Sequence, residues 1–243
     1  SENDGRDPHV CQLDVFSAGL KIMRYTINTQ ISRPDSALVN RFAHLAVPDI
    51  CDALGRNAAL PSSIRPLNCT RILGIAYTVN LPASENLLLY YAAEKAQPGD
   101  VIVASCAGYT ERAVTGDVMA SYCMKRGLAG FVIDGAVRDL AGLRELDFPV
   151  YARAVNPNGP YKDACGEINV PVSLGNVVVE PGDIIVGDLD GLVAIHPGEA
   201  CRVAEKAAEI AGRAQKKIEA IHRSGTMELT WHQSKLDETG YRI

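Results

Sequence analysis

Short apolar runs alternate with segments of helical periodicity along the middle of the chain. The apolar runs have the length and β-branched content of buried strands, and they cover residues 75–79, 101–103, 130–133 and 150–155. Between them, apolar residues recur every three or four positions, which predicts helices beginning near Ser84, at Asp117 and at Asp139. Asp134 and Gly135 predict the end of the third strand. This alternation is typical of an α/β fold.

The last third of the chain has a different pattern. After a loop rich in Asn and Gly over residues 156–166, the sequence predicts short strands at residues 171–172, 177–179, 184–186 and 192–195. Residues 198–223 have the periodicity of a long amphipathic helix, and residues 227–243 predict another short one. Pro181-Gly182-Asp183 repeats Pro98-Gly99-Asp100, but the flanking residues differ, so we interpret the repeat as shared turn chemistry.

The N-terminal part predicts two helices and an extension. A helix opens at Asp35 with its apolar residues on one face, a short helix covers residues 47–54, and residues 61–68 form a loop. Residues 1–32 lack clean periodicity and are expected to form an N-terminal arm. Because no linker divides the remainder, residues 33–243 are expected to form a single α/β domain with a compact mixed central sheet flanked by helices.

Charge and composition restrict the kind of ligand. The chain has 243 residues, a net charge of -5 and scattered basic residues, so neither nucleic acid nor a membrane surface is expected as a partner. The 7 cysteines never form CxxC spacing, which argues against a zinc site or a disulfide framework and favours a reducing cytoplasm. The 5 histidines show no ligand spacing, and neither a signal peptide nor a membrane span is predicted. A small-molecule ligand is therefore expected.

The first candidate for chemistry begins at Gly116. Glycine lets the backbone approach a ligand closely, and the amides of Val118 and Met119 belong to the first turn of a predicted helix. Free N–H groups and the helix dipole favour an anion such as a carboxylate there. Asp117 would stand beside that anion, although taken alone an Asp at a helix start is more simply explained as an N-cap.

The second candidate is the pair Arg138-Asp139, which follows the next predicted strand. The planar guanidinium of Arg138 suits a carboxylate or the oxygen pair of a keto acid, and the carboxylate of Asp139 suits Mg²⁺ or Mn²⁺. Each residue could instead be a cap or a surface arginine. Two helix starts after consecutive strands, however, lie at the same edge of an α/β sheet, where such sheets bind ligands. The two motifs together predict a metal and oxyanion site.

A single carboxylate ligand with several waters suits Mg²⁺, and a second carboxylate can hold or deprotonate those waters. Such a metal polarises a bound carbonyl group. If a 2-oxo acid chelates the metal, the ion stabilises an enolate, which is the difficult step of retro-aldol cleavage or β-decarboxylation. The predicted ligand is therefore a small 2-oxo acid.

Several segments of the chain resemble those of a known protein family. The segment GDVMASYCMKRGLAGFVIDGAVRDL resembles the class II pyruvate aldolases of the 4-hydroxy-4-methyl-2-oxoglutarate aldolase type, a family that also includes RraA-like proteins. Its hallmark is a GD pair and an RD pair separated by twenty residues. The resemblance runs from about Val47 to the C-terminus, through SENLLLYYAAEKAQPGDVIVAS, EPGDIIVGDLDGLVAIHP and MELTWHQSKLDETGY.

The resemblance implies the RraA-like swivelling α/β/α fold and a metal-dependent lyase that releases pyruvate from 4-hydroxy-2-oxo acids and decarboxylates oxaloacetate. It implies a homotrimer, or a hexamer of paired trimers, with active sites between subunits. Asp139 would bind the metal directly, and Asp117 would act through water as orienting group or base. Arg138 would grip the pyruvyl group, residues 116–119 would supply backbone donors, and Asn86 would line the substrate pocket.

The chain departs from the pattern of the family at two places. Tyr90 stands where the aldolases tend to carry a histidine, so it is expected in the pocket wall with a changed role in proton transfer. Near Ala214 and Gln215 there is no acid where a neighbouring subunit usually contributes a glutamate, and Glu209 or Glu219 are the candidates to replace it.

Two other functions are compatible with the resemblance. The first is that of a non-catalytic RraA-like regulator that binds an endoribonuclease. The regulators of that branch lack intact GD and RD pairs, whereas this chain keeps both. The second is that of an enzyme with the same metal and enolate chemistry that acts on a different 2-oxo acid.

Overall fold

Parallel strands form the centre of the sheet. The computed structural model describes residues 25–68, 71–163, 166–227 and 230–240. Four strands lie side by side in the order β2, β3, β5 and β6, all parallel, and a short fifth strand, β4, pairs in parallel with β5. Their bounds are β2 (Ile72–Asn80), β3 (Asp100–Ser105), β4 (Ala113–Thr115), β5 (Gly130–Val137) and β6 (Val150–Val155).

Antiparallel strands extend this centre on both sides. At one edge β1 (Arg65–Pro66) pairs with β6, and at the other β10 (Ile184–Gly187) pairs with β2 and with β11 (Leu192–Ile195). A short strand, β7 (Glu167–Ile168), also pairs with β2, while β8 (Val172–Leu174) and β9 (Val177–Val179) form a separate hairpin. The expected mixed sheet is thereby confirmed.

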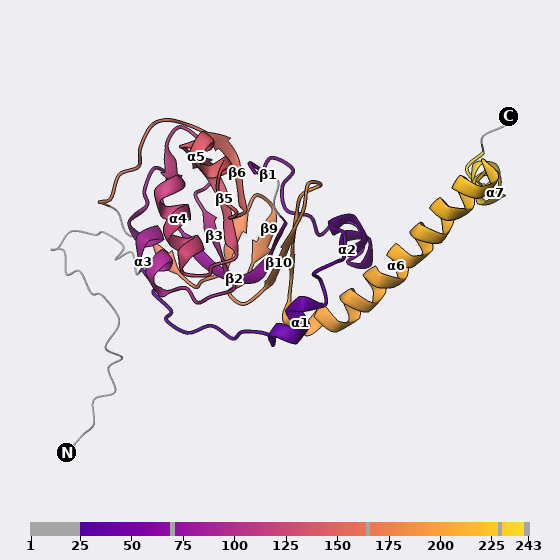
Figure 1. The fold of residues 1–243 in the computed structure, drawn as a ribbon, viewed down its shortest axis with the longest axis horizontal. Helices are drawn as coiled ribbons and strands as arrows, with labels where there is room; N and C mark the ends of the chain where they lie inside the picture. Colours follow the sequence, from indigo (N-terminus) through magenta and orange to yellow (C-terminus); the bar gives the residue numbers. More distant parts are fainter. Residues whose placement is uncertain (1–24, 69–70, 164–165, 228–229, 241–243) are drawn as a thin grey trace, which may run out of the picture.

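Helices cover the sheet in two groups (Figure 1). The helices α3 (Leu87–Lys95), α4 (Asp117–Lys125) and α5 (Leu140–Arg144) bury apolar residues against one face, where Phe131 and Ile133 of β5 point. Val132, between them in sequence, points to the other face, which the β8–β9 hairpin covers. The helices α1 (Ser36–Asn40) and α2 (Val47–Ala53) pack with α6 (Pro197–Ser224) near β10 and β11. Neighbouring residues of one strand thus support two different cores.

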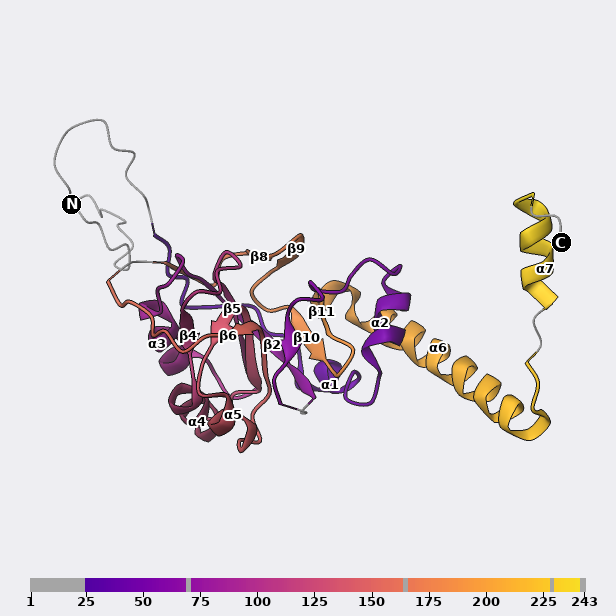
Figure 2. The same ribbon diagram turned by 90° about the horizontal axis from the view of Figure 1, so that it is seen from above.

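The long helix α6 lies against the body only over its first part. Its buried residues, Ala200, Val203, Ala204 and Ala207, all fall in the first eleven positions. The remainder projects away from the sheet and leads to α7 (Thr230–Glu238), as both views show (Figure 2). The predicted long C-terminal helix and a short helix after it are confirmed. Among the described residues, none of the helices has both the length and the apolar character that crossing a bilayer requires.

The two Pro-Gly-Asp turns use the same chemistry, as the sequence predicts. The carboxylate of Asp100 accepts a hydrogen bond from the Gln97 amide (2.8 Å), and that of Asp183 accepts one from the Glu180 amide (2.9 Å). Asp100 also forms a salt bridge with Arg33 (2.8 Å), which ties the segment before α1 to the start of β3.

Two predicted boundaries are wrong because long-range pairing overrides local signals. Ser84 does not cap α3; Asn86 holds the N-cap position without a side-chain bond, since the segment around Glu85 pairs with Tyr161. The strand predicted to stop at Asp134 and Gly135 continues to Val137, because β4 pairs with its extension. The register of β5 against β6 shifts at this point, so the turn signal marks a bulge.

The other differences at the sequence-predicted boundaries are smaller. The helix expected to begin at Asp139 covers Leu140–Arg144, and the loop expected at residues 61–68 contains β1. Most of the predicted N-terminal arm lies outside the described residues. Its described end runs beside β7, where Ile27 bridges Ile168 and the amide of Asn28 donates to the Ile168 carbonyl (3.1 Å).

We expect Asn68 to contribute strongly to stability. Its buried side-chain amide donates to the carbonyls of Leu143 (3.2 Å) and Phe148 (2.8 Å), and its oxygen accepts from the Val150 amide (3.0 Å). Asn68→Ala leaves these buried backbone groups without partners and should lower the free energy of unfolding by about 3 kcal/mol. Urea denaturation with an unchanged m-value measures the loss. The exposed Asn57 is the control, and Asn57→Ala should change stability by less than ~0.5 kcal/mol.

Candidate functional site

Backbone pairing between β4 and β5 brings the two sequence motifs together. Thr115 is the partner of Val137 in the ladder, and the Arg138 amide donates a hydrogen bond to the Thr115 carbonyl (3.0 Å). Gly116 follows Thr115 and Asp139 follows Arg138, so the starts of α4 and α5 lie at the same edge of the sheet. This is the carboxyl end of parallel strands, as the sequence predicts.

Gly116 and Asp139 are in direct contact. A Cβ atom at Gly116 would lie 2.2 Å from Oδ2 of Asp139, a distance at which no real side chain fits. Asp139 itself adopts left-handed backbone angles (φ 59°, ψ 41°), which are unfavourable for a residue with a side chain. Its carboxylate does not cap α5. The backbone is therefore held in an uncommon conformation that places this carboxylate over Gly116.

Arg138 lies beside this carboxylate. Its Nε is 3.4 Å from Oδ2 of Asp139, and both side chains are somewhat under half exposed (45% and 42%). A pair exposed to that extent contributes little to stability. The other end of the guanidinium lies close to Gly159, where a Cβ would approach Nη1 to 3.0 Å.

Asp117 takes a different place from the other candidates. It is the first residue of α4, and the N-cap, Gly116, makes no side-chain cap bond. Its carboxylate lies against Gly142 of α5, where a Cβ would be 2.3 Å from Oδ2. Asp117 therefore packs between the two helix starts and is not among the residues that line the cavity.

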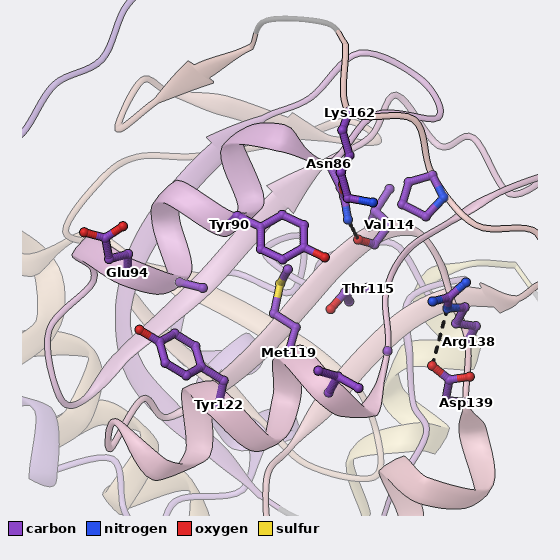
Figure 3. A pocket seen from close by; sticks show the side chains of 14 residues that line it. Asn86, Tyr90, Glu94, Val114, Thr115, Met119, Tyr122, Arg138, Asp139 and Lys162 are labelled. Atoms are coloured by element: carbon purple, nitrogen blue, oxygen red, sulfur yellow. Dashed lines mark hydrogen bonds and ion pairs between the residues drawn. The ribbon is translucent and has the colours of Figure 1, made fainter.

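A cavity of about 480 Å³ opens at this edge (Figure 3). Its volume is sufficient for a small organic acid. Seven of the eight sequence-predicted site residues line it, namely Asn86, Tyr90, Gly116, Val118, Met119, Arg138 and Asp139. The sequence analysis did not select its other lining residues, which are Ala93, Glu94, Val114, Thr115, Tyr122, Pro160 and Lys162.

Two buried polar atoms in the cavity wall have no partner among the described residues. Asn86 donates through Nδ2 to the Val114 carbonyl (2.7 Å), which leaves its Oδ1 unpaired. The hydroxyl of Thr115 is likewise buried and unpaired. Buried polar groups are rarely left in this state without a functional reason. Both atoms are candidates to bind a polar group of a ligand after a small local movement.

The loop after β6 forms the roof of the cavity and is firmly attached. The Ala113 amide donates to the Asn158 carbonyl (2.8 Å), and Arg112 donates to the Gly159 carbonyl (2.9 Å). The guanidinium of Arg112 also lies 4.4 Å from the centre of the Tyr161 ring. These contacts place Pro160 and Lys162 over the site. No local pattern indicates them, whereas Tyr122 could have been found from its spacing of three from Met119.

The charged groups at the site suit a cation that binds to few protein ligands, all of them oxygens. They do not suit a cation that requires thiolate or imidazole ligands. In the part of the chain that the structure describes, no three His, Cys, Asp or Glu side chains form a ligand cluster. The half-exposed carboxylate of Asp139 is an oxygen donor open to the cavity. A hard cation that keeps most of its waters needs no more than one or two such carboxylates.

Similarity to known proteins agrees with this arrangement. The family model "RraA-like: Aldolase/RraA" matches residues 47–194, which include both motifs. The chain belongs to the RraA-like aldolase family. A member from Halalkalibacterium halodurans, named "Putative 4-hydroxy-4-methyl-2-oxoglutarate aldolase", is 38% identical over 178 residues, which are 73% of this chain and 85% of that protein.

Solved structures of RraA-like proteins confirm the fold. An uncharacterised protein from Pseudomonas syringae pv. tomato superposes with a TM-score of 0.71 at 27% identity, over 81% of this chain and 97% of that one. Streptomyces coelicolor RraAS2, described as an unusual member of the RNase ES inhibitor RraA protein family, gives a TM-score of 0.71 at 28% identity, over 78% and 100% of the two chains. The relatives of this chain thus include one named as a putative aldolase and one described as a member of an inhibitor family.

We expect the buried cysteines near the site to be chemically inert. Burial raises the pKa of the Cys106 and Cys123 thiols to about 12, so the reactive thiolate is almost absent at pH 8. Iodoacetamide at pH 8, followed by peptide mass spectrometry, should modify the exposed Cys201 while leaving these two unmodified. Both should react after unfolding in guanidinium. Rapid labelling of Cys123 in the folded protein would contradict the described packing.

Proposed function

We propose that this chain is a divalent-metal-dependent carbon–carbon lyase that releases pyruvate from 4-hydroxy-2-oxo acids of the 4-hydroxy-4-methyl-2-oxoglutarate type and decarboxylates oxaloacetate. The observation that carries the proposal is the meeting of Arg138, Asp139 and the start of α4 around Gly116 at one cavity. The family and the name of the Halalkalibacterium halodurans relative support it.

Mg²⁺ or Mn²⁺ is the proposed cofactor because the available donors are carboxylates. Asp139 would hold the ion directly, and Asp117, which lies outside the cavity lining, would act through water. When bound, the ion supplies Lewis-acid polarisation of the substrate carbonyl.

The residues of the chain bind and orient the substrate. Arg138 would donate hydrogen bonds from its guanidinium to the carboxylate or keto oxygens, and its positive charge would stabilise the negative charge that develops on the oxygen. The amides of Val118 and Met119 lie in the first turn of α4, which has no side-chain cap, and would bind the remaining carboxylate oxygen. These contacts hold the reacting bond in one orientation inside a partly enclosed cavity.

Proton transfer completes the proposed reaction. The C4 hydroxyl loses its proton as the C3–C4 bond breaks, C4 becomes a carbonyl carbon, and C3 then takes up a proton to give pyruvate. Asp117 is the proposed proton acceptor, and because it lies outside the cavity lining it would work through an intervening water. Tyr90, whose side chain lines the same cavity, would lie beside the C4 side of the substrate.

The proposed assembly is a homotrimer, or a hexamer of paired trimers, with active sites between subunits. The proposed location of the protein is the cytoplasm. Within one protomer, the outer part of α6 projects away from α3 and α4, so Glu209 and Glu219 do not reach this chain's own cavity (Figures 1 and 2). In the protomer Glu209 pairs with Lys206 (3.2 Å) and Glu219 accepts from Gln215 (2.9 Å). Either glutamate could serve a site only on another copy.

A non-catalytic regulator is the alternative function. The likeness to Streptomyces coelicolor RraAS2, a member of an inhibitor family, supports it, but the intact pair of motifs around an open cavity favours catalysis. An enzyme of the same kind that acts on a different 2-oxo acid would share every feature of the site described so far.

Removing the guanidinium should remove most of the activity. Arg138→Ala should lower kcat/KM for pyruvate release at least ~100-fold, because removing one preorganised donor to a developing oxyanion typically slows a reaction by that factor. The measurement is a lactate-dehydrogenase-coupled assay with oxaloacetate and Mg²⁺, corrected for spontaneous decarboxylation. EDTA should abolish the activity and added Mg²⁺ restore it. Activity insensitive both to EDTA and to Asp139→Ala would exclude the proposed chemistry.

The contact between Gly116 and Asp139 gives a second test. A methyl group at Gly116 would displace the carboxylate from its position, so Gly116→Ala should lower kcat/KM at least ~10-fold and raise the Mg²⁺ concentration needed for half-maximal activity. Gly212→Ala is the matched control, because this glycine lies in α6 and a Cβ added there would meet nothing within 4 Å. It should leave activity unchanged and stabilise the helix by up to ~1 kcal/mol.

A further inference from the structure

The cavity has a second basic residue besides Arg138. Lys162 belongs to the roof loop and lines the cavity together with Tyr90 of α3. Figure 3 shows Lys162 at the roof above the Tyr90 ring, while Arg138 and Asp139 lie at another side of the cavity. Among the described residues that line it, Arg138 and Lys162 are the two with a positive charge.

The backbone on both sides of Lys162 is held by contacts within one protomer. The Tyr161 carbonyl accepts a hydrogen bond from the Asn86 amide (3.2 Å). The Asp163 amide donates to the buried carboxylate of Glu85 (3.0 Å), and Glu85 also forms a β-bridge with Tyr161. Lys162 therefore reaches the cavity from an anchored segment, although its own side chain is exposed.

The charge of Lys162 is not neutralised in the part of the chain that the structure describes, since it belongs to none of the ion pairs there. Its Nζ lies 5.8 Å from the centre of the Tyr90 ring, and this cation–π contact uses none of its N–H groups for a hydrogen bond. The acids of the lining have other partners. Glu94 pairs with Lys95 (2.7 Å), and Asp139 lies beside the guanidinium of the second motif.

We infer that Lys162 binds the distal carboxylate of the substrate and thereby selects diacids. The inference rests on the proposed function, in which Arg138 and the ion on Asp139 hold the C1 carboxylate and the keto oxygen. The carboxylate attached to C4 lies at the opposite end of such a substrate and needs a cation of its own. The ammonium of Lys162 supplies a positive charge and three donors there.

The proposed ion pair would persist through retro-aldol cleavage. With 4-hydroxy-2-oxoglutarate, the C3–C4 bond breaks, the C4 hydroxyl loses its proton as C4 becomes a carbonyl carbon, and C3 gains a proton. The products are pyruvate and glyoxylate. The distal carboxylate keeps its charge throughout, so Lys162 would stabilise the bound substrate and the transition state alike. Its contribution should therefore appear mainly in KM.

The same ion pair would oppose decarboxylation of oxaloacetate. Here the carboxylate on C3 leaves as uncharged CO₂, the electron pair of the C3–C4 bond passes to the enolate, and C3 then takes up a proton. An ion pair with Lys162 weakens as CO₂ forms, so it stabilises the bound substrate more than the transition state. Lys162 should thus favour aldol cleavage over decarboxylation.

The test compares 4-hydroxy-2-oxoglutarate with 4-hydroxy-2-oxopentanoate, which has a methyl group in place of the distal carboxylate. With the purified protein and Mg²⁺, and with pyruvate quantified by chromatography, kcat/KM should be at least ~10-fold higher for the diacid, the factor that a hydrogen bond between charged groups provides. Lys162→Gln should abolish this preference, mainly by raising KM for the diacid, and Lys162→Arg should retain most of it.

Lys125→Gln is the matched control, because Lys125 is an exposed lysine in the last turn of α4 and does not line the cavity. It should leave the diacid-to-monoacid ratio of kcat/KM unchanged. With oxaloacetate, Lys162→Gln should raise kcat and KM together, which a general loss of structure would not do.

Three results would count against these proposals. An unchanged diacid-to-monoacid ratio in Lys162→Gln would overturn the inference, and a sedimentation coefficient altered at the same time would show that this lysine serves contacts between subunits. An equal fall in kcat for all three compounds would also overturn it and leave the proposed function standing. Release of pyruvate from none of them by the unaltered protein would remove the proposed function itself.

Discussion

The space left by the missing side chain at Gly116 is the constraint on which the site depends. Oδ2 of Asp139 lies where the Cβ of any other residue would be. The hydrogen bond from the Arg138 amide to the Thr115 carbonyl fixes the ends of β4 and β5 in this register. The left-handed backbone of Asp139 turns its carboxylate over the glycine. Because parallel pairing holds both segments, the cost of the uncommon backbone is met by the surrounding sheet.

The remaining parts of the cavity depend on contacts between segments far apart in sequence. The roof belongs to the loop after β6, which is held by Arg112 and by the backbone of Asn158. The floor near Asn86 is held by its bond to the Val114 carbonyl. The lining thus combines the Arg138–Asp139 pair with Tyr90 and Tyr122, and two of its buried oxygens have no partner among the described residues.

Local signals predicted the elements better than their ends. The Pro-Gly-Asp turns behave as their residue types indicate, because the bond from the Asp100 carboxylate to the Gln97 amide closes within four residues. Ser84 and the Asp134-Gly135 pair were misleading, because pairing with Tyr161 in one case and with β4 in the other replaces the local preference. The short strands β4 and β7 were not predicted, and each is defined by its pairing with a longer strand, β5 for β4 and β2 for β7.

The sequence by itself determined the α/β class, the mixed sheet, the long C-terminal helix and the presence of both motifs at one sheet edge. These features follow from periodicity and from residue types that act over a few positions. Only the tertiary structure decided that Asp117 packs against Gly142 outside the cavity lining, and that Tyr122 and Lys162 complete the wall. The side-chain directions that decide this depend on the relative placement of α3, α4, α5 and the loop after β6, and contacts across the whole domain set that placement.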